Sequence, residues 1–464
     1  MAKLDVLKKL KYIEEKYPVE TINYRNIKIW PFIRCSIFNI YYFSDEVANT
    51  TVGNITETKI QRVFSALKLT SIVTFFKKHA VIVFTDDVGM KNFHGEYIDR
   101  IMQGIFSEEL SALPVVTKIH SQEVISLNKY VHADFLSFFI KLFSWFLPIK
   151  KNQISGGNIL KNIISELEIQ FDFFKYLKTI NGALYFYSMW FSMIKPRKIY
   201  VNCYYDLLRM PAFFVAKQAC IPIIEVQHGS ITSEPAYKAF KAISEHPYPN
   251  YLFVFGDRFK YGVSKHIYER DAIFSTGSYY IDLMLQDKNR NSELFHKKYP
   301  NLKDKIIITV ASQYDIDREI LDFTMQTASM DKRFFFIFIP RFIKDYHKKF
   351  KHANISIETE LDVYQCMQNS HITSAVVSTC AVESLAFGTP TVLINIGGLA
   401  VFNYADFFSE IHSVLYADTP DEYVQQIYKA IAFDRVSVAE EGKLFFADNY
   451  SERLKDAIIK IESK

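Results

Sequence analysis

One segment, residues 362–393, constrains the fold more than any other part of this sequence. It reads DVYQCMQNSHITSAVVSTCAVESLAFGTPTVL, which predicts a helix, a strand at 375–377, a polar turn at Ser378-Thr379, a helix at 379–387 and a strand at 391–396. In an open α/β sheet, ligands bind beyond the carboxyl ends of the strands. A helix that begins at such an end attracts anions. The segment therefore predicts a site for a phosphate-bearing ligand such as a nucleotide.

The rest of the chain shows the same alternation of strands and helices. Further apolar runs that predict strands occupy residues 79–84, 113–116, 198–202, 221–226, 250–255, 272–275, 306–310 and 334–339. Alternation of this kind predicts parallel sheets with helices on both faces. We expect an α/β fold of two Rossmann-like domains facing a cleft, preceded by a helical extension over residues 1–75.

Composition shifts divide the predicted fold. The stretch DKNRNSELFHKKYPNLKDK, residues 287–305, is rich in charge and contains a proline, which favours a linker. The predicted parts are a first domain at 1–290, a linker at 291–305, a second domain at 306–435 and a C-terminal helix at 436–464 that can cross back to the first domain.

Charge and composition exclude several classes of protein. The formal net charge of +4 is too small to indicate nucleic acid binding. The five cysteines are scattered, without a metal-binding or disulfide pattern, as in a cytosolic protein. The N-terminus has no apolar stretch typical of a signal peptide. We therefore expect a cytoplasmic protein.

Two segments are amphipathic and basic, at 59–78 and 135–148. The second, FLSFFIKLFSWFLP, is shorter than the roughly 20 residues that span a bilayer. Either segment can lie on an anionic membrane surface, which makes a peripheral inner-membrane location one hypothesis. The alternative, which we favour, is a helix packed on its own domain.

At three places the sequence resembles GT-B glycosyltransferases. Residues 225–229, EVQHG, resemble the QHG turn of bacterial capsule, O-antigen and teichoic-acid transferases. Residues 249–257, PNYLFVFGD, and 275–278, STGS, follow the course of the same proteins. The opening segment resembles their donor-site pattern of strand, Ser-Thr, acidic helix and Gly-x-Pro. The resemblance covers residues 195–400.

This resemblance implies a transferase that moves a sugar from a nucleotide-activated donor to a capsule, O-antigen or lipopolysaccharide glycan. Relatives with the QHG turn include Kdo and polysialyl transferases, which use CMP-activated acidic sugars. A CMP-Kdo-like donor is therefore favoured, with a UDP-sugar as the other candidate. Its partners would be the nucleotide sugar, a cosubstrate rather than a cofactor, and a free or lipid-linked glycan acceptor.

Two alternatives remain open. One is a CDP-glycerol or CDP-ribitol polyol-phosphate transferase. Several of those families carry Lys-x-His-Pro after the strand that here ends in Ile339-Pro340-Arg341, and the absence of His-Pro speaks against them. The other alternative is a non-catalytic scaffold of a polysaccharide assembly complex, which would keep the fold and lose the chemistry.

The resemblance and the strand ends together indicate donor-binding residues. Ser378 and Thr379 are expected to contact phosphate; the alternative is a helix N-cap, and the two roles are compatible because a cap leaves other N–H groups free. Glu383 would bind ribose hydroxyls, the alternative being a solvated glutamate. Ser312 and Gln313 follow another strand of the same domain and would face the donor, or form a polar turn.

Charged residues of the second domain bear on phosphate and metal binding. Arg341 would neutralise a phosphate or a sugar carboxylate, with a solvated charge as the alternative. Asp315 and Asp317 form a DxD pair, which holds Mn²⁺ or Mg²⁺ in GT-A enzymes. Because the chain resembles GT-B enzymes, which generally need no metal, we expect no metal site.

The first domain supplies the candidate catalytic residues. His228 is expected to accept the acceptor proton or to stabilise the leaving phosphate. Asp206 would act as a base in an inverting enzyme or as a nucleophile in a retaining one, with a helix N-cap as the alternative. The expected acceptor-side residues are Gln227, Gly229, Asp87 and His94.

Overall fold

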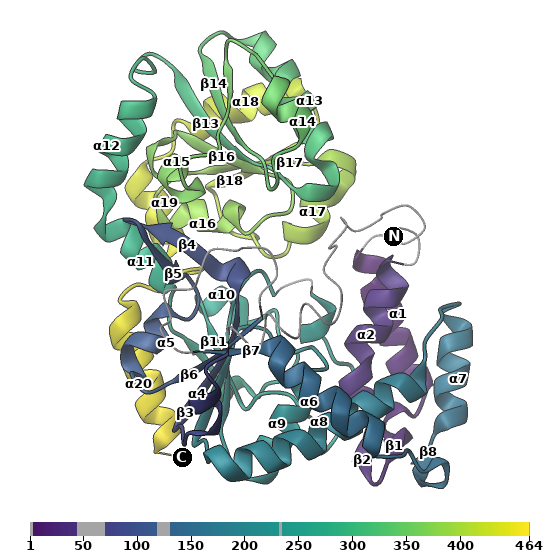
Figure 1. Ribbon diagram of the computed structural model, residues 1–464. Coiled ribbons are helices and arrows are strands. Elements are labelled where there is room, and N and C mark those ends of the chain that lie inside the picture. The colour runs from purple at the N-terminus through teal and green to yellow at the C-terminus, as the bar shows by residue number, and fades with distance from the viewer. Residues whose placement is uncertain (1–2, 44–69, 118–129, 232–233, 464) are drawn as a thin grey trace. The chain divides into compact units, whose positions relative to one another are not determined.

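The computed structural model describes residues 3–43, 70–117, 130–231 and 234–463, which form two compact units (Figure 1). The first unit comprises residues 1–254 and 260–274, and the second comprises 255–259 and 275–464. The short stretch 255–259 belongs to the second unit because its rings pack there. Phe255 stacks on Phe446 with ring centroids 5.2 Å apart, and an added Cβ at Gly256 would lie 2.5 Å from the backbone of Phe445.

A seven-stranded sheet forms the centre of the first unit. Its strands are β3 (Val81–Asp86), β6 (Leu113–Thr117), β7 (Val131–His132), β9 (Lys198–Val201), β10 (Ile223–Val226), β11 (Tyr251–Val254) and β12 (Ile273–Ser275). The order across the sheet is β12-β11-β10-β9-β3-β6-β7, and the pairs from β11 to β7 are parallel. Counted along the chain, these strands run 3-2-1-4-5-6-7, which extends the Rossmann order by one strand.

Helices and two small antiparallel sheets complete the first unit. The helices are α1 (Lys3–Lys16), α2 (Trp30–Phe43), α4 (Ile72–Phe76), α5 (Gln103–Glu108), α6 (Ala133–Phe146), α7 (Gly157–Glu166), α8 (Phe173–Ile194) and α9 (Met210–Gln218). The small sheets are β1 (Asn23–Tyr24) with β2 (Ile27–Lys28) and β8 (Ile154–Ser155), and the hairpin of β4 (Met90–Phe93) and β5 (Glu96–Asp99). The predicted N-terminal extension is therefore helical in α1 and α2 but also contains strands.

A buried ion pair ties this extension to the first unit. The Arg34 side chain contacts a Glu14 carboxylate oxygen at 2.9 Å, and the indole N–H of Trp30 donates to the same oxygen at 3.0 Å. The backbone N–H of Phe240 donates to the second Glu14 oxygen at 2.8 Å. Because a buried charge needs such partners, α1 and α2 are part of the core rather than an appendage.

The second unit contains a six-stranded parallel sheet. Its strands are β13 (Ile306–Ala311), β14 (Phe334–Ile339), β15 (Ile355–Ile357), β16 (Ile372–Ala375), β17 (Thr391–Ile394) and β18 (Val414–Ala417). Their order, β15-β14-β13-β16-β17-β18, is 3-2-1-4-5-6 in chain order, the order of a Rossmann sheet. The strands are nearly all apolar because helices cover both faces.

The helices of the second unit include the stretch predicted as a linker. They are α10 (Asp257–Lys260, mostly in this unit), α11 (Tyr279–Gln286), α12 (Lys288–Lys298), α13 (Asp317–Met330), α14 (Asp345–Lys349), α15 (Val363–Asn369), α16 (Cys380–Ala386), α17 (Leu399–Tyr404), α18 (Pro420–Ala430), α19 (Arg435–Gly442) and α20 (Tyr450–Glu462). The linker prediction at 291–305 is wrong, since Phe295 and Tyr299 are buried against Ile307, Ile337 and Cys366. The many charged residues of α12 indicated a linker in the sequence, although the other side of this helix is buried.

Two predicted elements lie elsewhere in the structure. The strand placed at 375–377 is β16, which begins at Ile372 and includes two buried hydroxyl residues, Thr373 and Ser374. Ser374 shares a hydrogen bond with Tyr423, so a polar residue is accommodated inside the sheet. The helix that was expected to follow Asp206 directly is α9, which begins at Met210.

The two amphipathic segments are described unequally. Residues 59–69 of the first lie outside the described residues, and its end contains α4. The second is α6, which packs along α8 through Phe143 and Phe186, with centroids 6.4 Å apart. Within the described ranges, no helix combines the length and the apolar character that crossing a membrane requires.

Candidate functional site

The second sheet brings the predicted donor residues to its topological switch point. The strand order reverses between β13 and β16, and in sheets of this kind ligands bind beyond the carboxyl ends of the strands at such a reversal. Gln313 follows β13, and its side-chain oxygen accepts a hydrogen bond at 3.1 Å from the backbone N–H of Val377, beyond β16. The structure thus joins the two strand ends on which the sequence analysis placed the donor site.

The Ser378-Thr379 turn is more self-contained than the sequence indicated. The Ser378 hydroxyl accepts a bond from the N–H of Cys380 at 3.3 Å, and the Ser378 carbonyl accepts one from the N–H of Ala381 at 3.1 Å. The first N–H groups of α16 therefore already have partners within the turn. The sequence had predicted that these groups would bind phosphate. Thr379 differs, because its half-buried hydroxyl has no hydrogen-bond partner among the described residues. Thr379 is the group of this turn best placed to bind a ligand.

Glu383 is buried rather than solvated. The hydroxyl of Tyr364, on α15, donates to its carboxylate at 2.8 Å. The alternative of a solvated glutamate is therefore wrong. The carboxylate is held in one place near the start of α16, which suits a group that accepts bonds from a ligand hydroxyl.

Ser312 and Asp317 belong to a buried hydrogen-bond network. The Ser312 hydroxyl and the Tyr346 hydroxyl both donate to the Asp317 carboxylate, and His347 lies 2.9 Å from it. Asp315, the other half of the DxD pair, is exposed. The two carboxylates therefore do not form a pair, and the described residues contain no group of three or more His, Cys, Asp or Glu side chains suited to a metal ion. Ser312 is oriented by this network.

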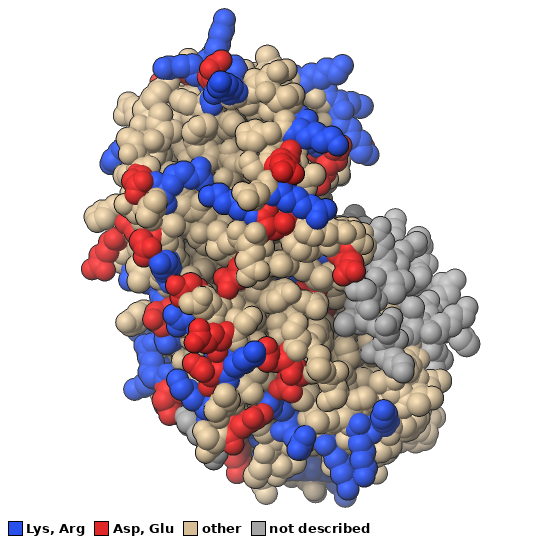
Figure 2. Space-filling view, turned by 90° about the vertical axis from the view of Figure 1, so that its left-hand side faces the viewer, with Lys and Arg blue, Asp and Glu red and all other residues tan. Residues whose placement is uncertain are grey.

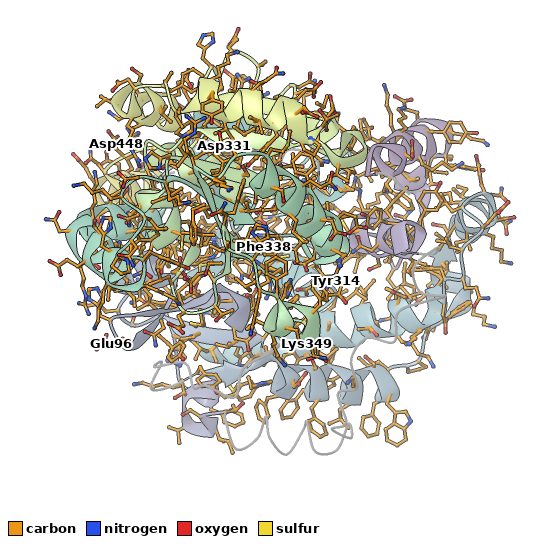
Figure 3. The ribbon with its side chains drawn as sticks, turned by 90° about the horizontal axis from the view of Figure 1, so that it is seen from above. Glu96, Tyr314, Asp331, Phe338, Lys349 and Asp448 are labelled. Atoms are coloured by element: carbon orange, nitrogen blue, oxygen red, sulfur yellow. The ribbon has the colours of Figure 1, made fainter. Side chains whose placement is uncertain are left out.

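A charged and aromatic surface follows β14. Arg341 is exposed and has no ion-pair partner among the described residues. Beside it, the exposed rings of Phe342 and Tyr314 meet edge to face with centroids 5.7 Å apart (Tyr314 is labelled in Figure 3). The sequence analysis missed this pair, although both rings directly follow predicted site residues. Exposed aromatic faces next to a cation can stack on a nucleotide base.

Two glycines at the end of β17 were also missed. Gly397 and Gly398 have positive φ angles of 59° and 75°, and open space lies where their Cβ atoms would be. The Tyr404 hydroxyl on the following helix, α17, donates at 2.8 Å to the carbonyl of Ser378. A glycine pair after a strand was the available signal, because such loops let a ligand approach the backbone.

The first sheet has its own switch point, between β3 and β9. The Asn202 side chain, just after β9, donates at 2.6 Å to Asp86 at the end of β3. The buried guanidinium of Arg209 donates to the Asn202 side-chain oxygen at 3.0 Å and to the Cys203 carbonyl at 2.7 Å. The sequence analysis missed Asn202 and Arg209, which alone show no motif; the sheet order makes them neighbours of Asp86.

Asp206 joins the same network. Its carboxylate accepts the backbone N–H groups of Leu208 at 2.8 Å and Arg209 at 2.7 Å, and it lies 3.2 Å from the Arg209 side chain. The carboxylate therefore orders the turn before α9, although the N-cap position of this helix is Arg209 and not Asp206. Because the side chain is still 42% exposed, it also remains accessible to a substrate.

His228 follows β10, the strand next to β9. Its Nδ1 atom is buried and has no hydrogen-bond partner among the described residues. Burial lowers the pKa of the imidazole below its ordinary value of 6.5; the charges of Arg100 and Arg209 act in the same direction, and Asp86 opposes them. A neutral imidazole near pH 7 has a nitrogen lone pair that can accept a proton.

The expected acceptor-side residues fall into two groups. Gln227 is buried, and its amide donates at 2.8 Å to the carbonyl of Gly229, which fixes the turn that carries His228. Asp87 is buried in the turn after β3. His94 lies at the exposed tip of the β4–β5 hairpin, with its ring stacked on Phe93; Glu96, labelled in Figure 3, follows it. Their role toward an acceptor stays a prediction.

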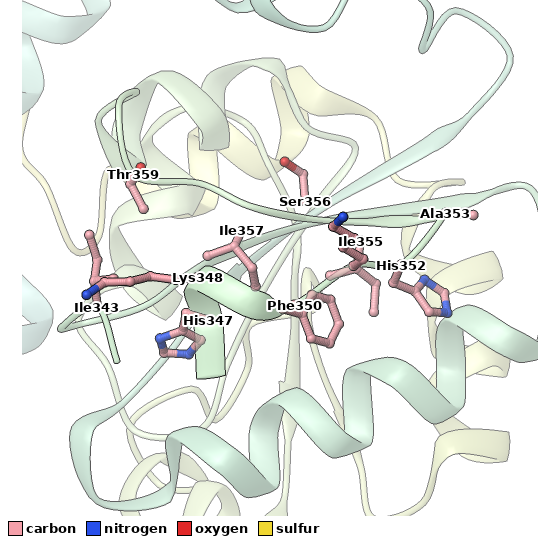
Figure 4. A pocket seen from close by; sticks show the side chains of 11 residues that line it. Ile343, His347, Lys348, Phe350, His352, Ala353, Ile355, Ser356, Ile357 and Thr359 are labelled. Carbon is pink, nitrogen blue, oxygen red and sulfur yellow. The ribbon is translucent and has the colours of Figure 1, made fainter. Parts of the chain in front are cut away.

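A separate hollow of about 790 Å³ lies at the edge of the second sheet (Figure 4). Side chains of α14, of β15 and of the segment between them line it, including His347, Phe350, His352 and Ile357. None of the predicted donor residues lines this hollow, so it is distinct from the switch point of the second sheet.

Comparison with known proteins gives the fold. No family model matches the sequence, and no curated protein matches it. UDP-GlcNAc 2-epimerase from Neisseria meningitidis, solved with UDP-GlcNAc bound, is similar in structure, with a TM-score of 0.50 and 11% identity over 82% of this chain and 99% of that one. The UDP-GlcNAc 2-epimerase of Methanocaldococcus jannaschii has a TM-score of 0.48 and 12% identity, covering 82% of this chain and 99% of that one. The wall teichoic acid polymerase TagF has a TM-score of 0.44 and 9% identity, covering 92% and 97%.

At these identities the similarity concerns the fold alone, and it is strongest for the Neisseria meningitidis epimerase among these three structures. Its likeness, together with two Rossmann-type sheets, identifies the fold of this chain as GT-B. The predicted fold class is thereby confirmed.

Proposed function

We propose that this protein is a GT-B glycosyltransferase that uses a nucleotide-activated sugar to build a surface polysaccharide. The observation that carries the proposal is the switch point of the second sheet. There Gln313 links β13 to β16, the Thr379 hydroxyl is unpartnered, and Gly397-Gly398 opens the backbone after β17. Hydroxyl and backbone N–H groups at such a place suit the phosphates of a nucleotide.

The proposed donor has a base, a ribose and an acidic sugar. The rings of Tyr314 and Phe342 would contact the base, and the buried carboxylate of Glu383 would accept bonds from the ribose hydroxyls. Arg341 would pair with a phosphate or with the carboxylate of the sugar. The resemblance in the QHG turn and this exposed cation favour a CMP-activated acid similar to Kdo over a UDP-sugar.

The first unit would supply the acceptor chemistry. A neutral His228 would accept the proton of the acceptor hydroxyl as the sugar is transferred. The Asp86–Asn202–Arg209 network orders the neighbouring strand ends, where the half-exposed carboxylate of Asp206 would accept a hydrogen bond from a glycan hydroxyl. No metal or other cofactor is part of this proposal, so activity should persist in the presence of EDTA.

Nucleotide binding is the direct test. Calorimetry against CMP, CDP and UDP would be followed by transfer assays with the matching donors. CMP binding with sugar transfer supports the proposal, whereas CDP binding with polyol-phosphate transfer would replace it. If millimolar concentrations of every nucleotide leave the melting temperature unchanged, the donor site is refuted and a scaffold role follows.

Matched variants separate binding from structure. Thr379→Val removes the unpartnered hydroxyl and should weaken nucleotide binding about tenfold, the effect of one lost hydrogen bond to a charged group. Thr373→Val is the control, because this hydroxyl is buried and unpartnered inside β16, away from the strand end. Equal losses in both variants would show that the site lies elsewhere.

A second pair of variants tests the catalytic residues. His228→Ala should lower transfer by about 10²- to 10⁴-fold while nucleotide affinity is kept. Asp206→Asn keeps an oxygen that can accept the Leu208 and Arg209 N–H groups, so it tests the charge rather than the turn. Loss of nucleotide binding in either variant would assign that residue a structural role.

A further inference from the structure

The outer face of helices α4, α6 and α8 is apolar where solvent-facing helices are normally polar. On α6, Phe138, Leu142 and Trp145 are exposed at the spacing of one helical stripe, and Trp145 is 78% exposed. The opposite stripe of the same helix, which contains Leu136 and Ile140, is buried. A helix that is apolar on both faces is usually covered on both.

The three helices form one layer. Phe75 of α4 lies between the other two, with ring centroids 5.0 Å from Phe135 and 5.3 Å from Trp190. Phe143 of α6 contacts Tyr185 of α8 at 5.0 Å. The exposed residues therefore lie over a shared buried aromatic layer, and rings stand out from the pale blue helices along the lower edge of Figure 3.

The patch extends over all three helices. In addition to the α6 stripe, it contains Val73, which is 80% exposed, and Phe76 on α4, together with Tyr185 and Met189 on α8. Contiguous exposed apolar surfaces of this kind mark sites of protein or membrane contact. Tryptophan and tyrosine in particular favour the boundary between lipid and water.

The charges around the patch indicate what binds to it. Residues 71–80, 133–151 and 173–195 contain a single acidic residue, Asp134. All of their lysines are exposed: Lys77, Lys78, Lys141, Lys150, Lys151, Lys175, Lys178 and Lys195. By contrast, positive and negative side chains are interspersed over the face seen in Figure 2. Uniform lysines around exposed aromatic rings complement an anionic lipid surface.

We propose that this face of α4, α6 and α8 binds the surface of an anionic membrane, with Trp145 and Phe146 inserted at the headgroup boundary. The proposal rests on these helices alone and does not depend on the transferase function. It also revises the sequence-based preference for simple packing, because α6 both packs on α8 with its inner stripe and presents a second apolar stripe outward.

Vesicle flotation tests the proposal with the full chain. Vesicles of phosphatidylglycerol and phosphatidylethanolamine should carry the protein, and vesicles of phosphatidylcholine should carry about tenfold less or none. The double variant Trp145→Ser/Phe146→Ser should bind at least tenfold more weakly. Leu110→Ser is the matched control, since Leu110 is 90% exposed, lies outside the patch, and should leave binding unchanged.

Fluorescence gives a second readout that does not depend on stability. Trp30 and Trp190 are fully buried, so a blue shift on adding anionic vesicles reports on Trp145. Trp145→Phe should keep binding and lose the shift. The proposal is overturned if the wild-type chain fails to float in 50 mM salt, if both vesicle types bind equally, or if light scattering shows a dimer that the double variant abolishes, because a second copy would then cover the patch.

Discussion

Replacing Glu225 with glutamine should make the first unit more stable at alkaline pH. Glu225 is fully buried in β10, two residues before the turn that contains His228. The hydroxyls of Tyr237, at 2.7 Å, and Tyr268 both donate to its carboxylate. Burial raises the pKa of this carboxyl from 4.5 to about 7, even though the two tyrosine bonds lower it.

The sign follows from proton binding. Between pH 4.5 and 7 the folded state holds a proton on Glu225 that the unfolded chain releases, so stability falls as the pH rises through this interval. Over this interval the free energy of unfolding falls by about 3 kcal/mol, at roughly 1.4 kcal/mol per pH unit. Glutamine does not titrate and resembles the protonated acid. The variant should therefore match the wild type at low pH and exceed it by up to about 3 kcal/mol at pH 8.

Tryptophan fluorescence can follow the first unit by itself, because all three tryptophans, Trp30, Trp145 and Trp190, lie in it. Urea unfolding of the wild type and of Glu225→Gln would be compared from pH 5 to pH 8. The difference in the free energy of unfolding between the two proteins leaves out the contributions of the other titrating groups, which both proteins share. Curves that stay parallel across this range would show that Glu225 is ionised in the native state and would refute the reasoning.

Glu358, in the second unit, provides a control with the opposite sign. It is also buried, but bonds from Lys298 and Tyr299, each at 2.7 Å, outweigh the effect of burial and lower its pKa. Its contribution is present above the pKa of the unfolded chain and is lost as the pH falls. Glu358→Gln should therefore cost stability at neutral pH, measured by circular dichroism, and the cost should shrink in acid.

Four further substitutions test the packing. Arg34→Met should cost about 3 to 5 kcal/mol in the fluorescence transition, because it leaves the buried Glu14 charge unpaired; a loss below 1 kcal/mol would mean that α1 and α2 are dispensable. Gly388→Ala should cost more than Gly397→Ala in a thermal melt, because both have positive φ but an added Cβ meets the Arg435 carbonyl at 2.5 Å at the first position and open space at the second; equal costs would contradict this. Tyr364→Phe removes the hydroxyl that donates at 2.8 Å to the buried Glu383 carboxylate, and it should cost about 1 to 3 kcal/mol. If no such loss is measured, the carboxylate must be solvated.

The sequence alone determined the fold class and the two strand ends on which we propose the donor site. Periodic apolar runs located most strands of both sheets, because a strand covered on both faces must be almost wholly apolar. The Ser378-Thr379 turn and Gln313 were found because polar residues that follow such a run stand out. These signals are local, and each can be read within about ten residues.

The tertiary structure decided which strand ends are neighbours. Strand order places β3 beside β9 and β13 beside β16, although each pair is separated by more than fifty residues. Only this order makes Asn202 and Arg209 partners of Asp86. Only the burial of Glu383 in the folded protein distinguishes it from a solvated glutamate. The division into units was misplaced for the same reason: α12 is charged along its sequence, and its buried face depends on strands that follow it. Long-range neighbours decide burial and hydrogen bonding, and no local pattern records them.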